Sequence, residues 1–160
     1  MTSLLTAAVI AAIVGSAMIG GIFFAFSSFI MKALDRLPSP EGMAAMQSIN
    51  KVILNRSFLG LFMGTAVLSA LLLGLAIFNG QAPGSIWLSA GAAAYLLGTF
   101  LLTGMGNVPL NERLDKVSRD SAEASEIWAL YLQRWTRLNT VRTVMALLAA
   151  VFLLVGLLGF

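Results

Sequence analysis

Charged side chains are absent from three long stretches of this sequence, residues 1–31, 57–111 and 143–160. A helix needs about 20 apolar residues to cross the ~30 Å hydrocarbon core of a bilayer. The middle stretch is long enough for two such helices, and Asn79-Gly-Gln-Ala-Pro-Gly84 within it is typical of a turn. We therefore expect one all-α domain, residues 1–160, built as a four-helix transmembrane bundle with helical extensions on the cytoplasmic side. Its spans are expected at about residues 5–31, 57–79, 86–106 and 140–159.

The composition excludes several functional classes. The chain is 59% hydrophobic and 11% charged, whereas soluble domains carry about 25% charged residues. It contains neither cysteine nor histidine, which excludes disulfides, thiol redox motifs and metal sites with thiolate or imidazole ligands. The carboxylates between residues 112 and 126 lack the Glu-x-x-His pattern of di-iron bundles. We therefore predict no metal and no cofactor.

The basic residues predict the topology. All ten lysines and arginines lie in the first connection between spans (residues 32–56) or in the third (residues 113–142). By the positive-inside rule, both connections face the cytoplasm and both termini lie outside, in a multi-pass protein of the cell membrane. The net charge of +3 then reflects orientation and lipid contacts, and does not indicate a nucleic-acid partner. The partners we expect are membrane lipids and a lipophilic small-molecule substrate, with homo-oligomerisation left open.

Both polar connections have helical patterns. Apolar residues from Met43 to Ile53 recur at helical spacing and predict an amphipathic helix at about 40–56, running without a break into the second span. A polar helical segment is expected at about 109–139. No proline or glycine occurs from Asp115 to Arg142, so this segment should continue into the fourth span as one long helix. Pro109 should end the helix of the third span and begin a new one, with Asn107 or Val108 near its cap.

Side-chain spacing predicts further local contacts. Ser16 with Gly20, and Gly60 with Gly64, are small-residue pairs that allow close helix packing. We expect the second pair to seat a helix of the same bundle. Two oppositely charged pairs have the spacing of helical ion pairs, which favours a solvated face for their carboxylates. These pairs are Glu112 with Lys116 and Asp115 with Arg119.

Polar groups gather at the cytoplasmic mouth expected for this bundle. Arg142 stands directly before the last uncharged stretch and shares a helical stripe with Trp135 and Asn139. Its charge either snorkels to the headgroups or faces the bundle, where it can hold an oxyanion or phenolate. Five asparagines share this mouth, and together they indicate the polar rim of a pocket more than five separate caps. They are Asn50, Asn55, Asn107, Asn111 and Asn139.

These residues resemble a known family. The element Asn107-Val-Pro-Leu-Asn111, with Leu114 and the stripe from Trp128 to Arg142, is similar to the anthrone oxygenase-like family of small four-span membrane proteins. The segments Gly20–Phe24 and Gln47–Asn55 look similar too, so the resemblance covers nearly the whole chain. Characterised fungal members oxidise polyketide anthrones to anthraquinones with molecular oxygen, and many bacterial members have no assigned activity. The resemblance implies a membrane oxygenase or oxidoreductase for an anthrone-, phenol- or quinol-like substrate.

A site without metal ligands suits this chemistry, because an anthrone loses a proton to give a delocalised anion that reacts with oxygen itself. The base stays open between Glu112, Asp115, a tyrosinate at Tyr131 and water. Catalytic roles in holding the anion are expected for Arg142, Asn107, Asn111 and Asn139. Substrate contacts are expected from Trp128, Tyr131, Trp135, Asn50, Asn55, Phe23 and Phe26.

A second function class stays open beside the enzyme. The face with Gly60 and Gly64, together with the amphipathic helix at about 40–56, would also suit a non-catalytic protein that binds lipid or a membrane partner subunit. Transport coupled to an ion gradient is less favoured, because the uncharged stretches lack the ionisable residues that such transport uses.

Overall fold

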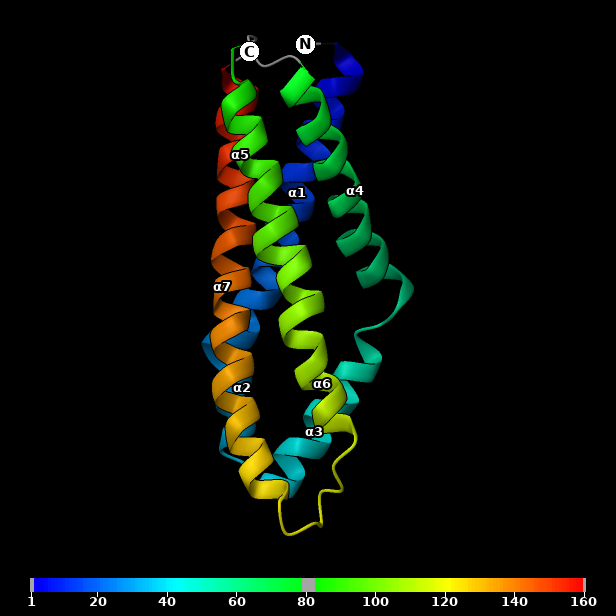
Figure 1. Ribbon diagram of the computed structural model, residues 1–160, viewed down its shortest axis with the longest axis vertical. Coiled ribbons are helices and arrows are strands. Elements are labelled where there is room, and N and C mark those ends of the chain that lie inside the picture. Colours follow the sequence, from blue (N-terminus) through cyan, green and yellow to red (C-terminus); the bar gives the residue numbers. More distant parts are fainter. Residues whose placement is uncertain (1, 79–82, 160) are drawn as a thin grey trace.

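The computed structural model describes residues 2–78 and 83–159, which form four long helical rods (Figure 1). The first rod comprises α1 (Ser3–Ala25), the π-helix η1 (Phe26–Ile30) and α2 (Met31–Asp35). Helix α3 (Ser39–Val52) leads to the second rod, α4 (Arg56–Phe78). The third rod comprises α5 (Ser85–Tyr95), the π-helices η2 (Leu96–Leu101) and η3 (Thr103–Asn107), and α6 (Val108–Asp115). The fourth is α7 (Ala124–Leu158).

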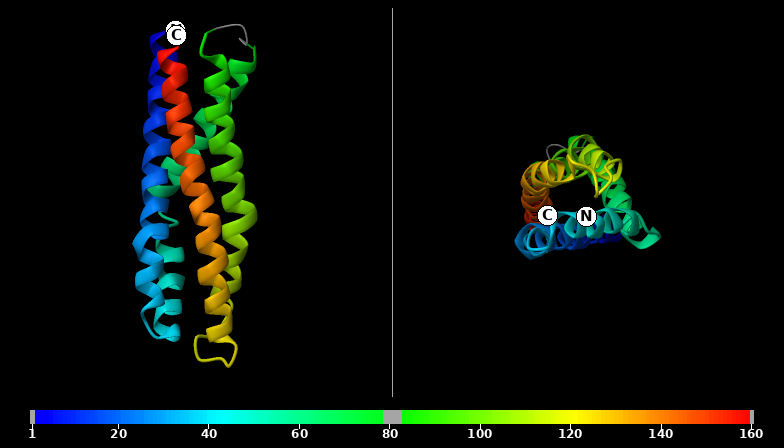
Figure 2. Two further views of the ribbon diagram at one scale, coloured as in Figure 1. Left: turned by 90° about the vertical axis from the view of Figure 1, so that its left-hand side faces the viewer. Right: turned by 90° about the horizontal axis from the view of Figure 1, so that it is seen from below.

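The four rods form a closed bundle. Helix α1 packs on α4 and α7, and α5 packs on the same two helices, so the rods stand around a square seen end-on in Figure 2. Each rod is long and apolar enough to cross a membrane by length and composition. The prediction of an all-α bundle with four candidate spans is therefore confirmed. The turn expected at residues 79–84 lies mostly outside the described residues.

The rods differ in length, and this difference creates a second packing region. Helix α4 has 23 residues, whereas the other rods have 31 to 35. Twenty-three residues span about 35 Å, close to one bilayer core. The upper ends of the rods are level in Figure 1, so the other three project past the start of α4, by roughly 12–18 Å. The projecting parts and α3 pack around their own core, which includes Met43, Met46 and Leu114. We call this region, residues 31–52 and 108–139, the helical extension.

Close crossings between rods depend on small residues. Ser16 is fully buried, and a Cβ atom on Gly20 would lie 2.9 Å from Leu147 Cδ2 on α7. This small-residue pair therefore packs as predicted. The expectation for Gly60 and Gly64 is wrong, because both are exposed on α4 and a Cβ atom on either would meet nothing within 4 Å. Since α4 is apolar all round, its sequence does not indicate which face is buried.

An α-helical segment begins beside Pro109 with Asn107 at the N-cap position, as predicted, but the expected break in the rod is absent. The π-helix η3 runs directly into α6, and Asn107 keeps helical dihedral angles without a side-chain capping bond. Pro109 lies in the first turn of α6. The missing proline N–H is tolerated because the adjoining π turns change the hydrogen-bond register. The helix therefore continues to Asp115, contrary to the expectation from the proline.

Two helices expected to be continuous are interrupted. Residues 53–55 separate α3 from α4, and Asn55 closes this break: its Nδ2 donates to the Val52 carbonyl at 3.1 Å and its Oδ1 accepts from the Phe58 N–H at 3.0 Å. Residues 116–123 form a polar turn between α6 and α7. The long helix thus begins at Ala124, because Ser118, Asp120 and Ser121 favour turns over helix interiors.

Candidate functional site

A cavity of about 310 Å³ lies beside the first turn of α4, where the bundle meets the helical extension. This volume is in the range of small-molecule sites, about 300–1,000 Å³. Its walls come from α1, η1, α3, the α3–α4 connection, α4, η3, α6 and α7. The apolar lining residues are Ile22, Phe23, Phe26, Met46, Ile49, Ile53, Leu54, Phe58, Val108 and Trp135. The polar ones are Asn50, Lys51, Thr103, Asn111, Glu112, Asp115 and Arg142.

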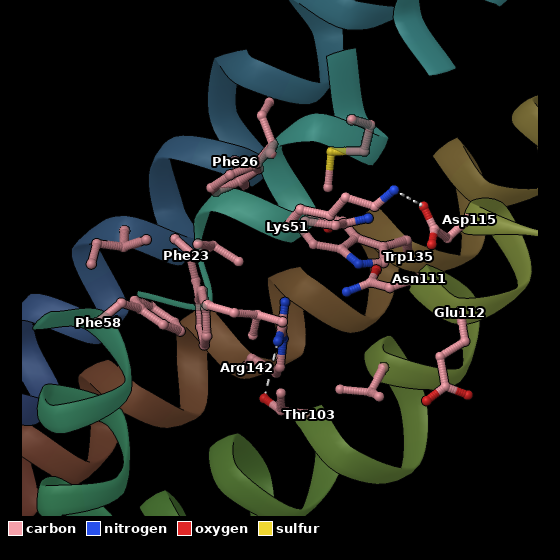
Figure 3. A pocket seen from close by; sticks show the side chains of 17 residues that line it. Phe23, Phe26, Lys51, Phe58, Thr103, Asn111, Glu112, Asp115, Trp135 and Arg142 are labelled. Atoms are coloured by element: carbon pink, nitrogen blue, oxygen red, sulfur yellow. Dashed lines mark hydrogen bonds and ion pairs between the residues drawn. The ribbon is translucent and has the colours of Figure 1, made fainter. Parts of the chain in front are cut away.

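Arg142 is a buried cation without a carboxylate partner among the residues that the structure describes. Its side chain is only 3% exposed, and its guanidinium carbon lies 4.0 Å from the Phe23 ring centroid and 5.4 Å from that of Trp135. Nη1 donates to Thr103 Oγ1 at 3.0 Å (Figure 3). Nη2 donates to Asn139 Oδ1 at 2.7 Å. Nε has no hydrogen-bond partner within residues 2–78 and 83–159. Neutral oxygens and π faces compensate a buried charge only in part, so this wall of the cavity favours an anion.

Asn139 holds Arg142 in place from outside the cavity. It is fully buried, and its Nδ2 donates to the Phe23 carbonyl and to Ser27 Oγ, both at 2.7 Å. Its Oδ1 is the acceptor for Arg142. Phe23 and Ser27 lie at the junction of α1 and η1, where π turns leave backbone carbonyls available to side-chain donors. Asn139 therefore ties α7 to α1 and fixes the guanidinium, without lining the cavity.

Asn107 also lies behind the cavity wall. It is 1% exposed, and its Nδ2 donates to the Trp135 carbonyl at 3.2 Å. Its Oδ1 has no hydrogen-bond partner in the described part of the chain. Thr103, which the sequence reasoning missed, lies in the wall itself and accepts from Arg142. Thr103, Asn107 and Asn111 recur every four residues, a spacing that places polar side chains on one face of a helix. This spacing could have identified Thr103 from the sequence.

The aromatic stripe of α7 is a stack that only partly faces the cavity. The Tyr131 ring centroid lies 5.8 Å from both Trp128 and Trp135, with interplanar angles of 13° and 21°. Trp128 and Tyr131 are each 2% exposed within the core of the helical extension. Trp135 lines the cavity, and its ring forms a T-shaped pair with that of Phe26, with the centroids 5.6 Å apart. The aromatic wall of the cavity therefore consists of Phe23, Phe26, Phe58 and Trp135.

Asn50 and Asn111 do line the cavity, and Tyr131 joins them from behind. The Tyr131 hydroxyl donates to Asn111 Oδ1 at 2.8 Å, and Asn50 Nδ2 donates to that hydroxyl at 3.3 Å. Of the five asparagines predicted at one pocket rim, the structure therefore brings two to the cavity. Asn107 and Asn139 lie behind its wall, and Asn55 caps α4.

An ion pair stands at the water-facing side of the cavity. Lys51 Nζ lies 2.8 Å from Asp115 Oδ1, with side chains 68% and 48% exposed. Asp115 thus pairs with α3 and not with Arg119, because α6 ends at Asp115. Glu112 also lines the cavity, and it forms no ion pair with Lys116 or with any other described residue. The described residues contain no cluster of three or more potential metal ligands of the His, Cys, Asp or Glu types.

Comparison with known proteins identifies the family. A family model described as anthrone oxygenase matches residues 55–152, which is more than half of the chain. No curated protein and no solved structure matches. The matched range includes α4, the whole third rod and most of α7, and so contains Thr103, Asn111, Trp135 and Arg142. Together with four helices of membrane-spanning length, this match shows that the chain belongs to the anthrone oxygenase family.

Proposed function

We propose that this protein is a membrane-embedded, cofactor-independent oxygenase for a lipophilic aromatic substrate of anthrone, phenol or quinol type. The observation that carries the proposal is Arg142, a 3%-exposed cation without a carboxylate partner in the wall of an aromatic cavity. Membership of the anthrone oxygenase family supports the reaction class.

The reaction of an anthrone illustrates what the site must do. Loss of a proton from the ring carbon opposite the carbonyl gives an anion whose charge is shared with the carbonyl oxygen. The carbon donates its electrons to molecular oxygen and a C–O bond forms. Protonation gives a hydroperoxide, which loses its second C–H proton as the O–O bond breaks. One oxygen atom remains as the new carbonyl and the other leaves as water.

Arg142 has the charge and position to lower the barrier of the first step. Charge develops on the substrate oxygen as the proton leaves, and a fixed cation in a poorly hydrated site stabilises that charge more strongly than water does. Thr103 and Asn139 hold the guanidinium in advance, so little reorganisation is required during the reaction. Phe23, Phe26 and Trp135 provide the surface for a flat ring system.

Glu112 is the base in this proposal. Of the three side chains considered from the sequence, Asp115 is paired with Lys51 and Tyr131 lies behind the wall, whereas Glu112 lines the cavity without an ion pair. We expect Glu112→Gln to lower kcat by about 100-fold, the lower end of general-base contributions. Single-turnover oxidation, followed by quinone absorbance, measures this step. Glu123→Gln, in the turn before α7, is the matched control. An unchanged rate in Glu112→Gln would contradict this role for Glu112 and leave water as the base.

The activity is tested by oxygen uptake in purified protein reconstituted in lipid nanodiscs. We expect protein-dependent uptake with an anthrone or with members of a panel of quinols, one labelled oxygen atom from ¹⁸O₂ in an oxygenated product, and no dependence on stoichiometric metal in the same sample. Uptake that tracks bound metal would contradict the cofactor-independent mechanism. Absence of uptake with all substrates would contradict the oxygenase itself.

One observation favours a second candidate, a non-catalytic protein that binds lipid or a membrane partner. Gly60 and Gly64 form a smooth strip on the exposed face of α4, which allows close approach of a lipid chain or another helix. Tight co-purification of one membrane protein, lost in Gly60→Leu/Gly64→Leu and combined with absent oxygen uptake, would support this candidate over the oxygenase.

A further inference from the structure

We propose that the cavity recognises a second polar group on its ligand, separate from the one held by Arg142, through Asn111 and Asn50, and that Tyr131 sets the orientation of both amides. The inference rests on the proposed function for the aromatic nature of the ligand and deepens it by naming a substrate class. That class is a flat aromatic molecule with one oxygen for Arg142 and a separate hydroxyl for the two amides.

A tyrosine hydroxyl has a single hydrogen, and this fixes the direction of the chain of bonds. Tyr131 donates that hydrogen to Asn111 Oδ1 at 2.8 Å and accepts from Asn50 Nδ2 at 3.3 Å. Each amide therefore bonds the Tyr131 hydroxyl through one of its two polar atoms. The remaining groups are Asn111 Nδ2, a donor, and Asn50 Oδ1, an acceptor. Neither atom has a hydrogen-bond partner among the described residues, and both residues line the cavity.

A donor and an acceptor from two amides that bond the same tyrosine hydroxyl suit a hydroxyl group on a ligand. A phenolic O–H can donate to Asn50 Oδ1 while its oxygen accepts from Asn111 Nδ2. A ligand without this hydroxyl leaves both amide groups without partners after they lose water, which lowers its affinity. The arrangement therefore selects for hydroxylated over unsubstituted aromatic ligands.

The two polar groups stand at different levels of the cavity. Thr103, which holds Arg142, and Asn111 are eight residues apart on one continuous rod, or about 12 Å of helix rise. Figure 3 shows Asn111 between Arg142 on one side and the Lys51–Asp115 pair on the other. Val108 and Phe58 contribute apolar wall. A ligand that bonds both Arg142 and the amides thus has an apolar body and two separate oxygen atoms.

Tyr131 acts as a positioning residue in this proposal. Its ring is 2% exposed and stacked between Trp128 and Trp135, and it does not line the cavity. Tyr131→Phe removes the hydroxyl but retains the stacked ring. Tyr95→Phe is the matched control, because the Tyr95 side chain is also fully buried and its hydroxyl bonds only the Phe62 carbonyl and the nearby Thr65, away from the cavity.

The test compares two non-reacting ligands, 2-hydroxyanthraquinone and anthraquinone, by equilibrium quenching of tryptophan fluorescence with the full chain in nanodiscs. We expect the wild type and Tyr95→Phe to bind the hydroxylated ligand about tenfold more tightly, a difference of about 1.4 kcal/mol. Tyr131→Phe should lose most of this preference while its affinity for anthraquinone stays within about twofold. Asn111→Leu, which removes the donor directly, should abolish the preference and serves as the second variant if Tyr131→Phe is poorly folded.

Three results would overturn the inference: equal affinity of the wild type for both ligands, equal weakening of both ligands by Tyr131→Phe, or no binding of either ligand. The measurement needs no turnover, so the outcome is separate from that of the oxygen-uptake test. Absent uptake with retained hydroxyl preference would contradict the oxygenase and leave the binding site standing. Oxygen uptake without the preference for the hydroxylated ligand would support the oxygenase and contradict the proposed hydroxyl site.

Discussion

Arg142→Gln is expected to lower kcat/KM for substrate oxygenation by about 100- to 1,000-fold, the loss typical of removing one preorganised donor to a developing oxyanion. Glutamine retains hydrogen-bonding atoms for Thr103 and Asn139 but carries no charge. Replacing a buried ion with a neutral side chain is often neutral or stabilising, so the thermal midpoint should stay equal or rise. Lower activity together with equal or higher stability would identify Arg142 as a functional cation, because a structural ion would change both in the same direction.

The control for this experiment is Arg137→Gln. It makes the same chemical change on α7, but Arg137 is exposed and does not line the cavity. Its activity and midpoint should match the wild type. Arg142→Lys should show a smaller loss than Arg142→Gln, since lysine keeps the charge but not the planar fork or the stacking on Phe23. Wild-type kcat/KM in well-folded Arg142→Gln would contradict the anion-stabilising role.

The largest effect on stability is expected from Gly91→Leu. A Cβ atom at Gly91 would lie 2.8 Å from the backbone nitrogen of Leu153 and 2.9 Å from the backbone carbonyl of Ala149. Backbone atoms cannot rotate away as side chains do, so α5 and α7 would have to separate along their whole contact. We expect a loss of about 3 kcal/mol or more in the free energy of unfolding, measured by reversible denaturation in mixed micelles.

Gly64→Leu is the matched control for the packing experiment. A Cβ atom at Gly64 meets nothing within 4 Å, and the residue is exposed on α4. Leucine favours helix over glycine by roughly 0.5–1 kcal/mol, so this variant should be as stable as the wild type or more stable. Similar losses in both variants would show that the contact between α5 and α7 is looser than these distances imply.

The four candidate spans follow directly from the sequence, because each depends on composition over about twenty residues. Membrane-spanning length requires uncharged stretches, and Arg142 stands at the edge of one. The stripe from Trp128 to Arg142 was also readable, since 3.6-residue periodicity places its members on one face. Family membership adds the reaction class to this outline.

The roles of individual polar residues could not be predicted from composition or periodicity. Asn50 and Asn55 both follow the amphipathic pattern, yet one lines the cavity and the other caps α4, because the break at residues 53–55 decides which direction each side chain takes. The π-helices have no residue signature, since Phe26–Ile30 would be apolar in any helix. The outward face of Gly60 and Gly64 depends on which neighbours α4 meets, and these are tertiary contacts.

The short length of α4 gives the lipid environment a direct influence on the site. The cavity opens beside the first turn of the one rod that matches a single bilayer core, while the other rods continue past it. In a thin bilayer the headgroups and their water reach this level, and the field of Arg142 is screened. In a thick bilayer, hydrophobic mismatch at α4 brings acyl chains toward the same level, and the lower dielectric strengthens the attraction between Arg142 and an anionic ligand. For the ligand proposed above, we therefore expect affinity to depend on acyl-chain length, through hydration and without any change in the protein's own contacts.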